Sequence, residues 1–356
     1  MVSEIVLVGL AFGISWWITG VVRRYALRKE LIDVPNERSS HAQPTPRGGG
    51  LAIALVTLCG LLSYSLLISL GYWRVIVFYV CGAVLVAVVS WLDDLYVLPN
   101  IVRFVTHSLA AVLTIIGFGH WDTVIVPLLG QVHLAWLSLP VSFLWIVGLT
   151  NAYNFMDGID GIAGGQAVVA GIGWAIVGML IDLPFVGILG ALLAATSLGF
   201  IFHNWPPARI FMGDVGSAFL GFSFACLAIA GASREPSLAI AGVLLVWPFV
   251  FDTLFTFFRR LKNRENVFAA HRSHLYQRLV ISGYSHQTVT LLYMGLDVLG
   301  LLLALLVLKK NVWTELTVVV TLTVCCFALW GSTVIREKRQ AQAIAKQRSE
   351  VSRFAL

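Results

Sequence analysis

The sequence has little charge: only 12% of its 356 residues are Asp, Glu, Lys or Arg, whereas 58% are hydrophobic. In a soluble globular domain about a quarter of all residues are charged, so this balance excludes an ordinary soluble protein. It indicates a polytopic membrane protein. The net charge of +6 does not point to nucleic acid, because the basic residues lie in loops between apolar runs, where they report membrane topology.

Cysteine is also scarce, and several common catalytic motifs are missing. The five cysteines lie inside apolar runs and form no CxxC pair, which favours packing residues over a disulfide or metal site. The sequence contains no GxxxxGK[ST], GxSxG or HExxH pattern, so ATP hydrolysis, serine hydrolysis and zincin chemistry lose support. No repeat of about 20–50 residues is visible.

Long apolar runs dominate what is present. A membrane-spanning helix needs about 20 such residues, and this length predicts eleven spans, at residues 3–22, 50–70, 75–92, 102–119, 137–153, 162–181, 184–202, 215–232, 238–258, 288–308 and 313–333. Residues 121–136 are too short to span and are expected to form a small external hairpin. The first run is not a signal peptide, because Glu4 precedes it and Arg23 and Arg24 follow it.

The placement of lysine and arginine predicts the orientation. With the N-terminus outside, 20 of the 24 basic residues fall in inside segments, and only Arg74, Arg234, Lys309 and Lys310 fall outside. This positive-inside bias predicts an all-α polytopic membrane protein of about eleven transmembrane helices, with its C-terminus in the cytoplasm. Residues 1–333 would form one integral-membrane domain, and residues 334–356 a basic cytoplasmic tail.

The polar stretch 151–161 lies between two apolar runs on the predicted cytoplasmic side. It places Asn151, Asn154, Asp157 and Asp160 at three-residue intervals. On a helical turn Asp157 and Asp160 would share a face. Carboxylates at membrane depth are expensive and are functional-site candidates by default.

Further acids lie at the ends of predicted spans. Asp93 and Asp94 end the third span; adjacent carboxylates repel, so they need a cation or a proton, although plain helix-end charge is an alternative. Asp214 begins the eighth span, where it would either cap the helix or hold a metal-bridged phosphate. Asp252 lies inside the ninth span and is expected to be a buried acid that pairs with an arginine from another loop.

Two loops offer groups that bind anions. Arg47 precedes the glycine triplet 48–50, which would present backbone N–H groups to an anion or simply form a turn. His271 and His274 would bind a diphosphate or sugar, unless they belong to an ordinary basic loop; zinc lacks a third nearby ligand. The acids match oxygen-only coordination, which favours Mg²⁺ or Mn²⁺ shared with substrate phosphates.

Taken together, these clusters resemble the polyprenyl-phosphate N-acetylhexosamine-1-phosphate transferases, glycosyltransferase family 4. The resemblance covers nearly the whole chain. Within the family, the sequence is most similar to the O-antigen-initiating branch. It rests on segments 46–49, 93–94, 151–161, 211–214, and, for that branch, 33–41 and 271–274. Ser273 stands where other branches have a further histidine, so the resemblance does not supply the sugar.

The resemblance implies ten or eleven spans with a cytoplasmic cleft in a bacterial inner membrane. It implies Asp93 and Asp94 as the catalytic pair and Asp214 as the ligand of Mg²⁺, with Mn²⁺ as an alternative. The implied substrate-binding residues are Arg47, Asn154, Asp157, Asp160, Asn204, Phe211, Gly213, His271 and His274.

The implied reaction transfers an N-acetylated sugar 1-phosphate from a UDP-sugar, of the UDP-GlcNAc or UDP-FucNAc/QuiNAc type, to undecaprenyl phosphate and releases UMP. It would initiate O-antigen or a related surface polysaccharide, within the lipid bilayer and without nucleic acid; a homodimer is compatible with the sequence. Direct displacement and a covalent aspartyl-phosphate route both stay open.

Two other classes of protein would also show many spans and buried acids. A secondary transporter would concentrate its charges at the midplane and often show two similar halves, whereas these acids lie at span ends. A non-catalytic scaffold for polysaccharide assembly would tolerate the loss of every carboxylate.

Overall fold

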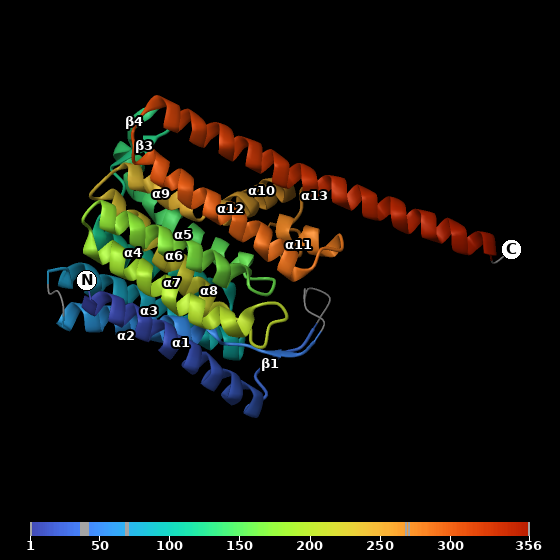
Figure 1. Ribbon diagram of the computed structural model, residues 1–356, viewed down its shortest axis with the longest axis horizontal. Coiled ribbons are helices and arrows are strands. Elements are labelled where there is room, and N and C mark those ends of the chain that lie inside the picture. The colour runs from blue at the N-terminus through green and yellow to red at the C-terminus, as the bar shows by residue number, and fades with distance from the viewer. Residues whose placement is uncertain (1, 36–42, 68–70, 268, 270, 355–356) are drawn as a thin grey trace.

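The computed structural model describes residues 2–35, 43–67, 71–267, 269 and 271–354, with side chains up to residue 342. Its long helices run side by side as an elongated bundle (Figure 1). They are α1 (Val2–Arg28), α2 (Gly50–Leu67), α3 (Trp73–Tyr96), α4 (Asn100–Phe118), α5 (Ser138–Met156), α6 (Ile162–Leu180), α7 (Pro184–Asn204), α8 (Asp214–Ala232), α9 (Ser237–Leu245), α10 (Trp247–Lys262), α11 (Leu275–Ile281), α12 (His286–Val307) and α13 (Val312–Phe354). Residues 36–41 of the predicted motif at 33–41 lie outside the described residues.

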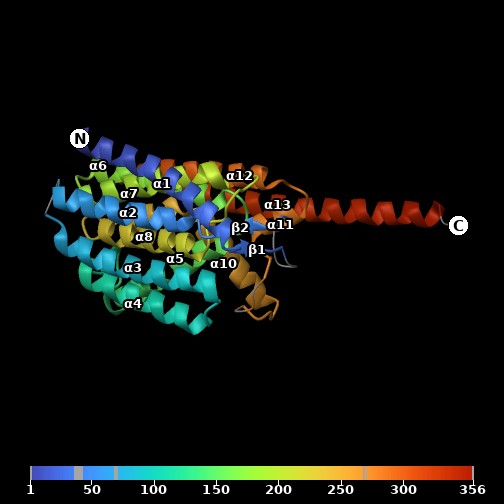
Figure 2. The ribbon, with the colours of Figure 1, turned by 90° about the horizontal axis from the view of Figure 1, so that it is seen from below.

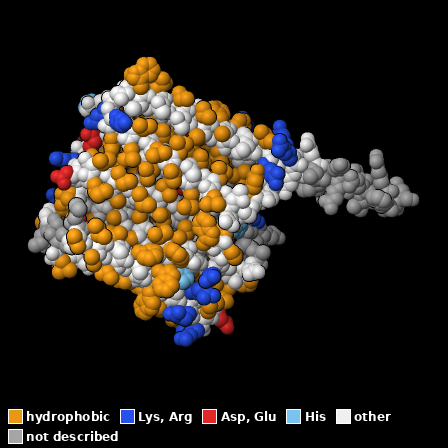
Figure 3. Space-filling view, in the orientation of Figure 1, with side chains coloured by type: hydrophobic (Ala, Val, Ile, Leu, Met, Phe, Trp, Pro, Cys, Tyr) orange, Lys and Arg blue, Asp and Glu red, His pale blue; other side chains and the backbone are white. Residues whose placement is uncertain are grey.

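The number of spans agrees with the sequence. Within the described ranges, ten helices are long and apolar enough to cross a membrane, and α9 with α10 form a bent pair that would be an eleventh span. The prediction of an all-α polytopic membrane fold is therefore confirmed. Figure 3 shows hydrophobic side chains over the middle of one face, with charged side chains toward its two ends. This is the pattern of a bundle whose middle lies in hydrocarbon.

The predicted ninth span is wrong as a single helix. Segment 238–258 breaks between α9 and α10, which meet at 79°. Pro248 lies in the first turn of α10, and proline has no N–H and its ring clashes with the preceding helical turn. The side-chain amide of Gln166 donates to the Leu245 carbonyl at the break, at 2.8 Å. Pro248 therefore accounts for the break, and Gln166 of α6 supplies a hydrogen bond to the Leu245 carbonyl at the end of α9.

Two short strand pairs connect the helices. β1 (Ile32–Asp33) pairs antiparallel with β2 (Thr45–Pro46), directly before Arg47. β3 (Thr123–Val126) and β4 (Gly130–His133) form the hairpin expected within residues 121–136. The N-terminus lies at the opposite end of the bundle from β1, β2 and α11 (Figure 2).

The predicted tail continues the last span. The boundary at residue 333 falls inside α13, which runs without a break to Phe354. Figures 1 and 2 show α13 extending well beyond the bundle, at the end where α11 lies.

Helix α8 is at the centre of the bundle, and its residues are buried on every side from Val215 to Ile229. Its first turn lies so close to α2 that a Cβ on Gly50 would be 2.3 Å from the Cα of Gly216. The N–H groups of Gly49 and Gly50 donate to the carbonyls of Phe211 and Met212, at 2.9 and 2.8 Å. The glycine triplet is thus held against the segment that leads into α8.

The close contact predicts that Gly50→Ala destabilises the protein. The added methyl overlaps the backbone of α8, and overpacking of this kind costs about 1–3 kcal/mol, so the thermal unfolding midpoint in detergent should fall. Gly148→Ala is the matched control, because a Cβ there meets nothing within 4 Å. Equal midpoints for the two variants would show that the α2–α8 contact does not require glycine.

Candidate functional site

A cavity of about 280 Å³ lies where several helix ends meet. Its wall combines the ends of α3, α5 and α7, the starts of α8 and α12, part of α11, and the segments between them. The lining residues are Asp33, Arg47, Asp94, Asn154, Asp157, Gly158, Ile159, Asp160, Asn204, Phe211, Met212, Gly213, Asp214, Ser217, Gln277 and His286.

Most of the predicted site residues meet in this cavity. Those lining it are Arg47, Asp94, Asn154, Asp157, Asp160, Asn204, Phe211, Gly213 and Asp214. Asp93, His271 and His274 are not among the lining residues. The lining residues that the sequence did not single out as site residues are Asp33, Gly158, Ile159, Met212, Ser217, Gln277 and His286.

Asp94 joins the end of α3 to the start of α8. Its two carboxylate oxygens accept the backbone N–H groups of Asp214 and Val215, at 3.1 and 3.2 Å. A Cβ at Gly213, where φ is +77°, would be 2.7 Å from Asp94 Oδ2, so glycine is required by both space and backbone conformation. Arg47 donates to the Asp94 carbonyl. The predicted motifs around these residues are therefore parts of one structure.

Arg103 of α4 is an unpredicted member of the site. Its Nη1 lies 3.1 Å from Asp93 Oδ2 and 3.3 Å from Asp214 Oδ2. Asp93 also accepts the N–H of Leu98. Arg103 thus supplies a cation to Asp93, one of the two adjacent acids, and to Asp214. This role was not predictable from the sequence, because one arginine at the start of a span is equally expected from topology.

The turn between α5 and α6 is held by several other segments. Asp160 accepts the N–H of Ala208 at 3.0 Å and lies 3.4 Å from Nδ1 of His286. Asn204 accepts the N–H of Gly161 and donates to the Ile210 carbonyl, both at 2.9 Å. These contacts fix the shape of the turn, and Asn204 is only 3% exposed.

Asp157 has an unusual electrostatic environment. Burial raises the pKa of Asp157 to about 8, and the carboxylates of Asp214 and Asp94 add to the effect. Against the five carboxylates on the cavity wall, the basic side chains there are Arg47 and His286. The cavity therefore favours a cation.

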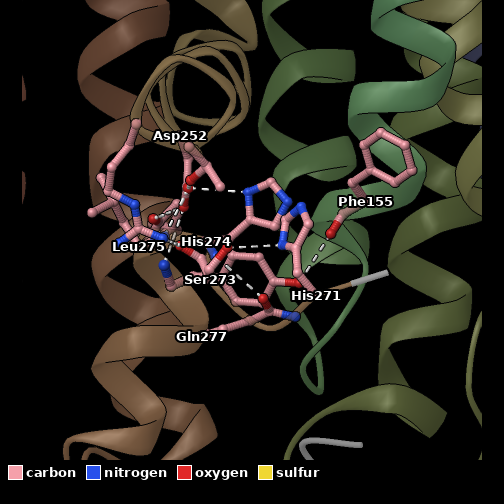
Figure 4. Close-up of polar contacts among 11 residues, drawn as sticks. Phe155, Asp252, His271, Ser273, His274, Leu275 and Gln277 are labelled. Atoms are coloured by element: carbon pink, nitrogen blue, oxygen red, sulfur yellow. Dashed lines mark hydrogen bonds and ion pairs between the residues drawn. The ribbon is translucent and has the colours of Figure 1, made fainter. Parts of the chain in front are cut away.

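The histidine loop lies beside the cavity. His274 is 4% exposed, and its Nδ1 is 3.2 Å from Asp252 Oδ1 (Figure 4). The expectation that Asp252 pairs with an arginine is wrong, because its partners are His274, Tyr293, Thr256 and the backbone that follows His274. His271 contacts the Ser273 hydroxyl at 3.0 Å. Contact of these histidines with substrate stays a prediction.

The groups on the cavity wall that could bind a metal are mainly oxygens of carboxylates, side-chain amides and the Ser217 hydroxyl, with the His286 imidazole beside them. Across the described part of the chain, no three His, Cys, Asp or Glu side chains are grouped to hold a metal by themselves. The set fits a hard cation such as Mg²⁺ or Mn²⁺ that is held by one or two carboxylates and completes its shell with phosphate oxygens. Asp214 is the predicted ligand.

Comparison with known proteins identifies related chains. The family model described as Glycosyl transferase family 4 matches residues 76–232, which include Asp93, Asp94, the stretch 151–161 and Asp214. A probable undecaprenyl-phosphate N-acetylglucosaminyl 1-phosphate transferase of Bacillus subtilis (strain 168) is 31% identical over 310 residues, covering 86% of each chain.

Two further relatives come from other bacteria. A decaprenyl-phosphate N-acetylglucosaminephosphotransferase of Mycobacterium leprae (strain TN) is 33% identical over 324 residues, 81% of this chain and 80% of the relative. An undecaprenyl-phosphate alpha-N-acetylglucosaminyl 1-phosphate transferase of Thermotoga maritima is 29% identical over 272 residues, 75% of this chain and 80% of the relative.

The raised pKa of Asp157 predicts a pH-dependent stability in metal-free buffer. Below about pH 4 the carboxyl is protonated in both folded and unfolded chains; between pH 4 and 8 only the unfolded chain ionises it. Stability should therefore fall as the pH rises, by at most ~1.4 kcal/mol per unit from this group. Asp157→Asn removes the effect, so its advantage in unfolding midpoint over the wild type should grow from pH 5 to pH 8. A constant difference over that range would contradict the assignment.

Proposed function

This chain belongs to glycosyl transferase family 4, and we propose that it transfers an N-acetylated sugar 1-phosphate from a UDP-sugar to undecaprenyl phosphate and releases UMP. The names of the relatives make UDP-GlcNAc the first donor to test, with UDP-FucNAc and UDP-QuiNAc as alternatives. The transfer would start O-antigen or a related polysaccharide at the bacterial inner membrane, with the cavity facing the cytoplasm.

The convergence of the predicted residues on one cavity carries this proposal. Five segments that are far apart in sequence contribute to its wall, at one end of an apolar bundle. Such a position lets a water-soluble nucleotide sugar meet a phosphate that is anchored in the bilayer. The N-terminus at the opposite end supports the cytoplasmic orientation of the cavity (Figure 2).

In the proposed reaction, a phosphate oxygen of the lipid attacks the phosphorus that bears the sugar. A new P–O bond forms while the bond from this phosphorus to the oxygen of the uridine phosphate breaks, and its electron pair leaves with UMP. The second pKa of a phosphomonoester is about 6, so the lipid phosphate is already deprotonated near neutrality. The protein must chiefly align two anions and reduce their repulsion.

The residues divide this task. Arg47 contributes a fixed positive charge on the cavity wall, and Asp94 faces the cavity, whereas Asp93 pairs with Arg103. Asp214 would hold Mg²⁺ or Mn²⁺ together with phosphate oxygens of the substrates, while Asp94 and Asp157 line the same cavity. When bound, the ion supplies charge neutralisation for the diphosphate and for the departing UMP. The turn 157–161 would form the floor of the nucleotide-sugar half of the cavity.

The proposal predicts that UMP release requires UDP-GlcNAc or a related UDP-sugar, undecaprenyl phosphate and Mg²⁺ together. Asp94→Asn and Asp214→Asn should each reduce kcat by about 10²–10³, the usual effect of removing a charge-stabilising group. Asp182→Asn is the control, because Asp182 is an exposed residue of the α6–α7 turn, outside the cavity wall. No UMP from any UDP-sugar tested would exclude the proposed function.

The contacts of Arg103 with Asp93 and Asp214 predict that this arginine competes with a cation for the site. Arg103→Gln leaves Asp93 and Asp214 without their shared positive charge, so in EDTA it should lose about 1–2 kcal/mol of stability, a value reduced by the partial exposure of Arg103. Mg²⁺ should then raise its unfolding midpoint more than that of the wild type, and Mn²⁺ should bind more tightly by electron paramagnetic resonance.

Arg74→Gln is the control, because Arg74 donates to the Ile116 carbonyl and is outside the cavity wall. An Arg103→Gln variant that responds to Mg²⁺ no more than the wild type does would exclude competition between this arginine and a cation.

A further inference from the structure

Asp252 carries a buried carboxylate that lies outside the cavity wall. Its side chain is fully buried on α10. Oδ1 accepts hydrogen bonds from the Thr256 hydroxyl at 3.2 Å and the Leu275 N–H at 2.8 Å, and it faces Nδ1 of His274 at 3.2 Å. Oδ2 accepts the Tyr276 N–H at 3.1 Å and the Tyr293 hydroxyl at 2.6 Å. One carboxylate therefore joins α10, the start of α11, and α12.

An ionised carboxylate suits this position, because every group around it can donate. Asparagine has nearly the same shape but only one acceptor oxygen. If its NH₂ group replaced Oδ2, it would face the N–H of Tyr276; if it replaced Oδ1, it would face the N–H of Leu275. Either way a buried backbone donor at the start of α11 would lose its acceptor, and such a loss is costly.

Helix α11 continues this connection to the cavity. The hydroxyl of Tyr276 donates to the Phe155 carbonyl at 3.0 Å (Figure 4). It also lies against the turn itself, since a Cβ on Gly158 would be 2.1 Å from the Tyr276 oxygen. The next residue, Gln277, lines the cavity. The position of α11 thus determines both part of the cavity wall and the support of the turn that carries Asp157.

We propose that Asp252 is a positioning residue of the site: it fixes the start of α11, and α11 fixes the turn 157–161 and the cavity wall beside it. His274 acts in the same unit, with its ring held in place by Asp252. The inference rests on the proposed function in one respect, namely that this side of the cavity receives the nucleotide sugar. Asp252 contacts no substrate; it acts through Tyr276 and Gln277.

The first test uses the full-length protein in detergent with UDP-GlcNAc, undecaprenyl phosphate and Mg²⁺. Asp252→Asn should raise the KM for UDP-GlcNAc by about tenfold, while the KM for undecaprenyl phosphate stays within about twofold. A merely structural role would instead lower the active fraction and hence kcat, with both KM values unchanged. Unchanged KM values, or an equal rise in both, would overturn the proposal.

Asp297→Asn is the matched control. Asp297 is also a fully buried aspartate, on α12 one turn beyond Tyr293. Neither of its oxygens has a hydrogen-bond partner within the described residues, and it is outside the cavity wall. Loss of its carboxylate should leave both KM values unchanged. A selective KM change in Asp297→Asn equal to that of Asp252→Asn would show that any buried acid here has the same effect.

Tyr276→Phe keeps the inference testable if Asp252→Asn folds poorly. It removes only the hydroxyl that contacts Phe155, so the KM for UDP-GlcNAc should rise selectively but by less, about threefold. Where both variants fold, the double variant should raise the KM for UDP-GlcNAc by less than the product of the two single increases, because Asp252 acts through Tyr276. Full additivity would show that Asp252 and Tyr276 act independently, which would contradict the proposal that Asp252 acts through Tyr276.

Hydrogen–deuterium exchange tests the positioning without any turnover. Peptides that cover residues 155–161 should exchange faster in Asp252→Asn than in the wild type or Asp297→Asn, because the turn loses its support. Unchanged exchange in this turn would overturn the inference. If the wild type releases no UMP from any UDP-sugar, the proposed function fails, whereas the exchange experiment still decides the role of Asp252.

Discussion

The two hydrogen bonds from the first N–H groups of α8 to Asp94 hold together the end of the bundle that carries the site. They join the end of α3 to the central helix, and they leave no room for a side chain at Gly213. The same first turn of α8 lies against Gly50, which brings the segment with Arg47 beside it. Each motif around the cavity therefore depends on the close approach of its neighbours, and glycine is found where backbones come nearest.

This tight construction creates an excess of negative charge. Five carboxylates from four separate segments line a cavity whose basic side chains are Arg47 and His286. The pKa of Asp157 rises because the group is buried and lies near other acids. Arg103 offsets part of this charge from outside the cavity wall. A site of this kind is stabilised by whatever cation enters it. For a reaction between two phosphates, a cation would reduce the same kind of repulsion in the substrates. One cation would therefore reduce both the repulsion among these carboxylates and the repulsion between the reacting phosphates.

Much of the fold and of the cavity could be predicted, because both follow from one-dimensional patterns. The apolar runs predicted every long span, and the positive-inside count placed all the acidic clusters at one end, where most of the proposed residues meet. Partners across helices were not predictable in this way. Arg103 and His286 lie in segments with no motif, and their roles arise only from the packing of α4 and α12 against other helices.

The two errors of the sequence-based prediction have a common physical cause. If the ninth span were one straight helix, Asp252 would lie six residues beyond the break at Val246, or roughly 9 Å further along the axis of α9. The break before Pro248 turns α10 by 79° instead, which displaces Asp252 by roughly 10 Å from that position. There it meets His274 and the start of α11 rather than an arginine of another loop. The proline that interrupts the span is therefore part of what places α11 against the turn 157–161, and the broken helix is a constraint on the site as much as on the membrane fold.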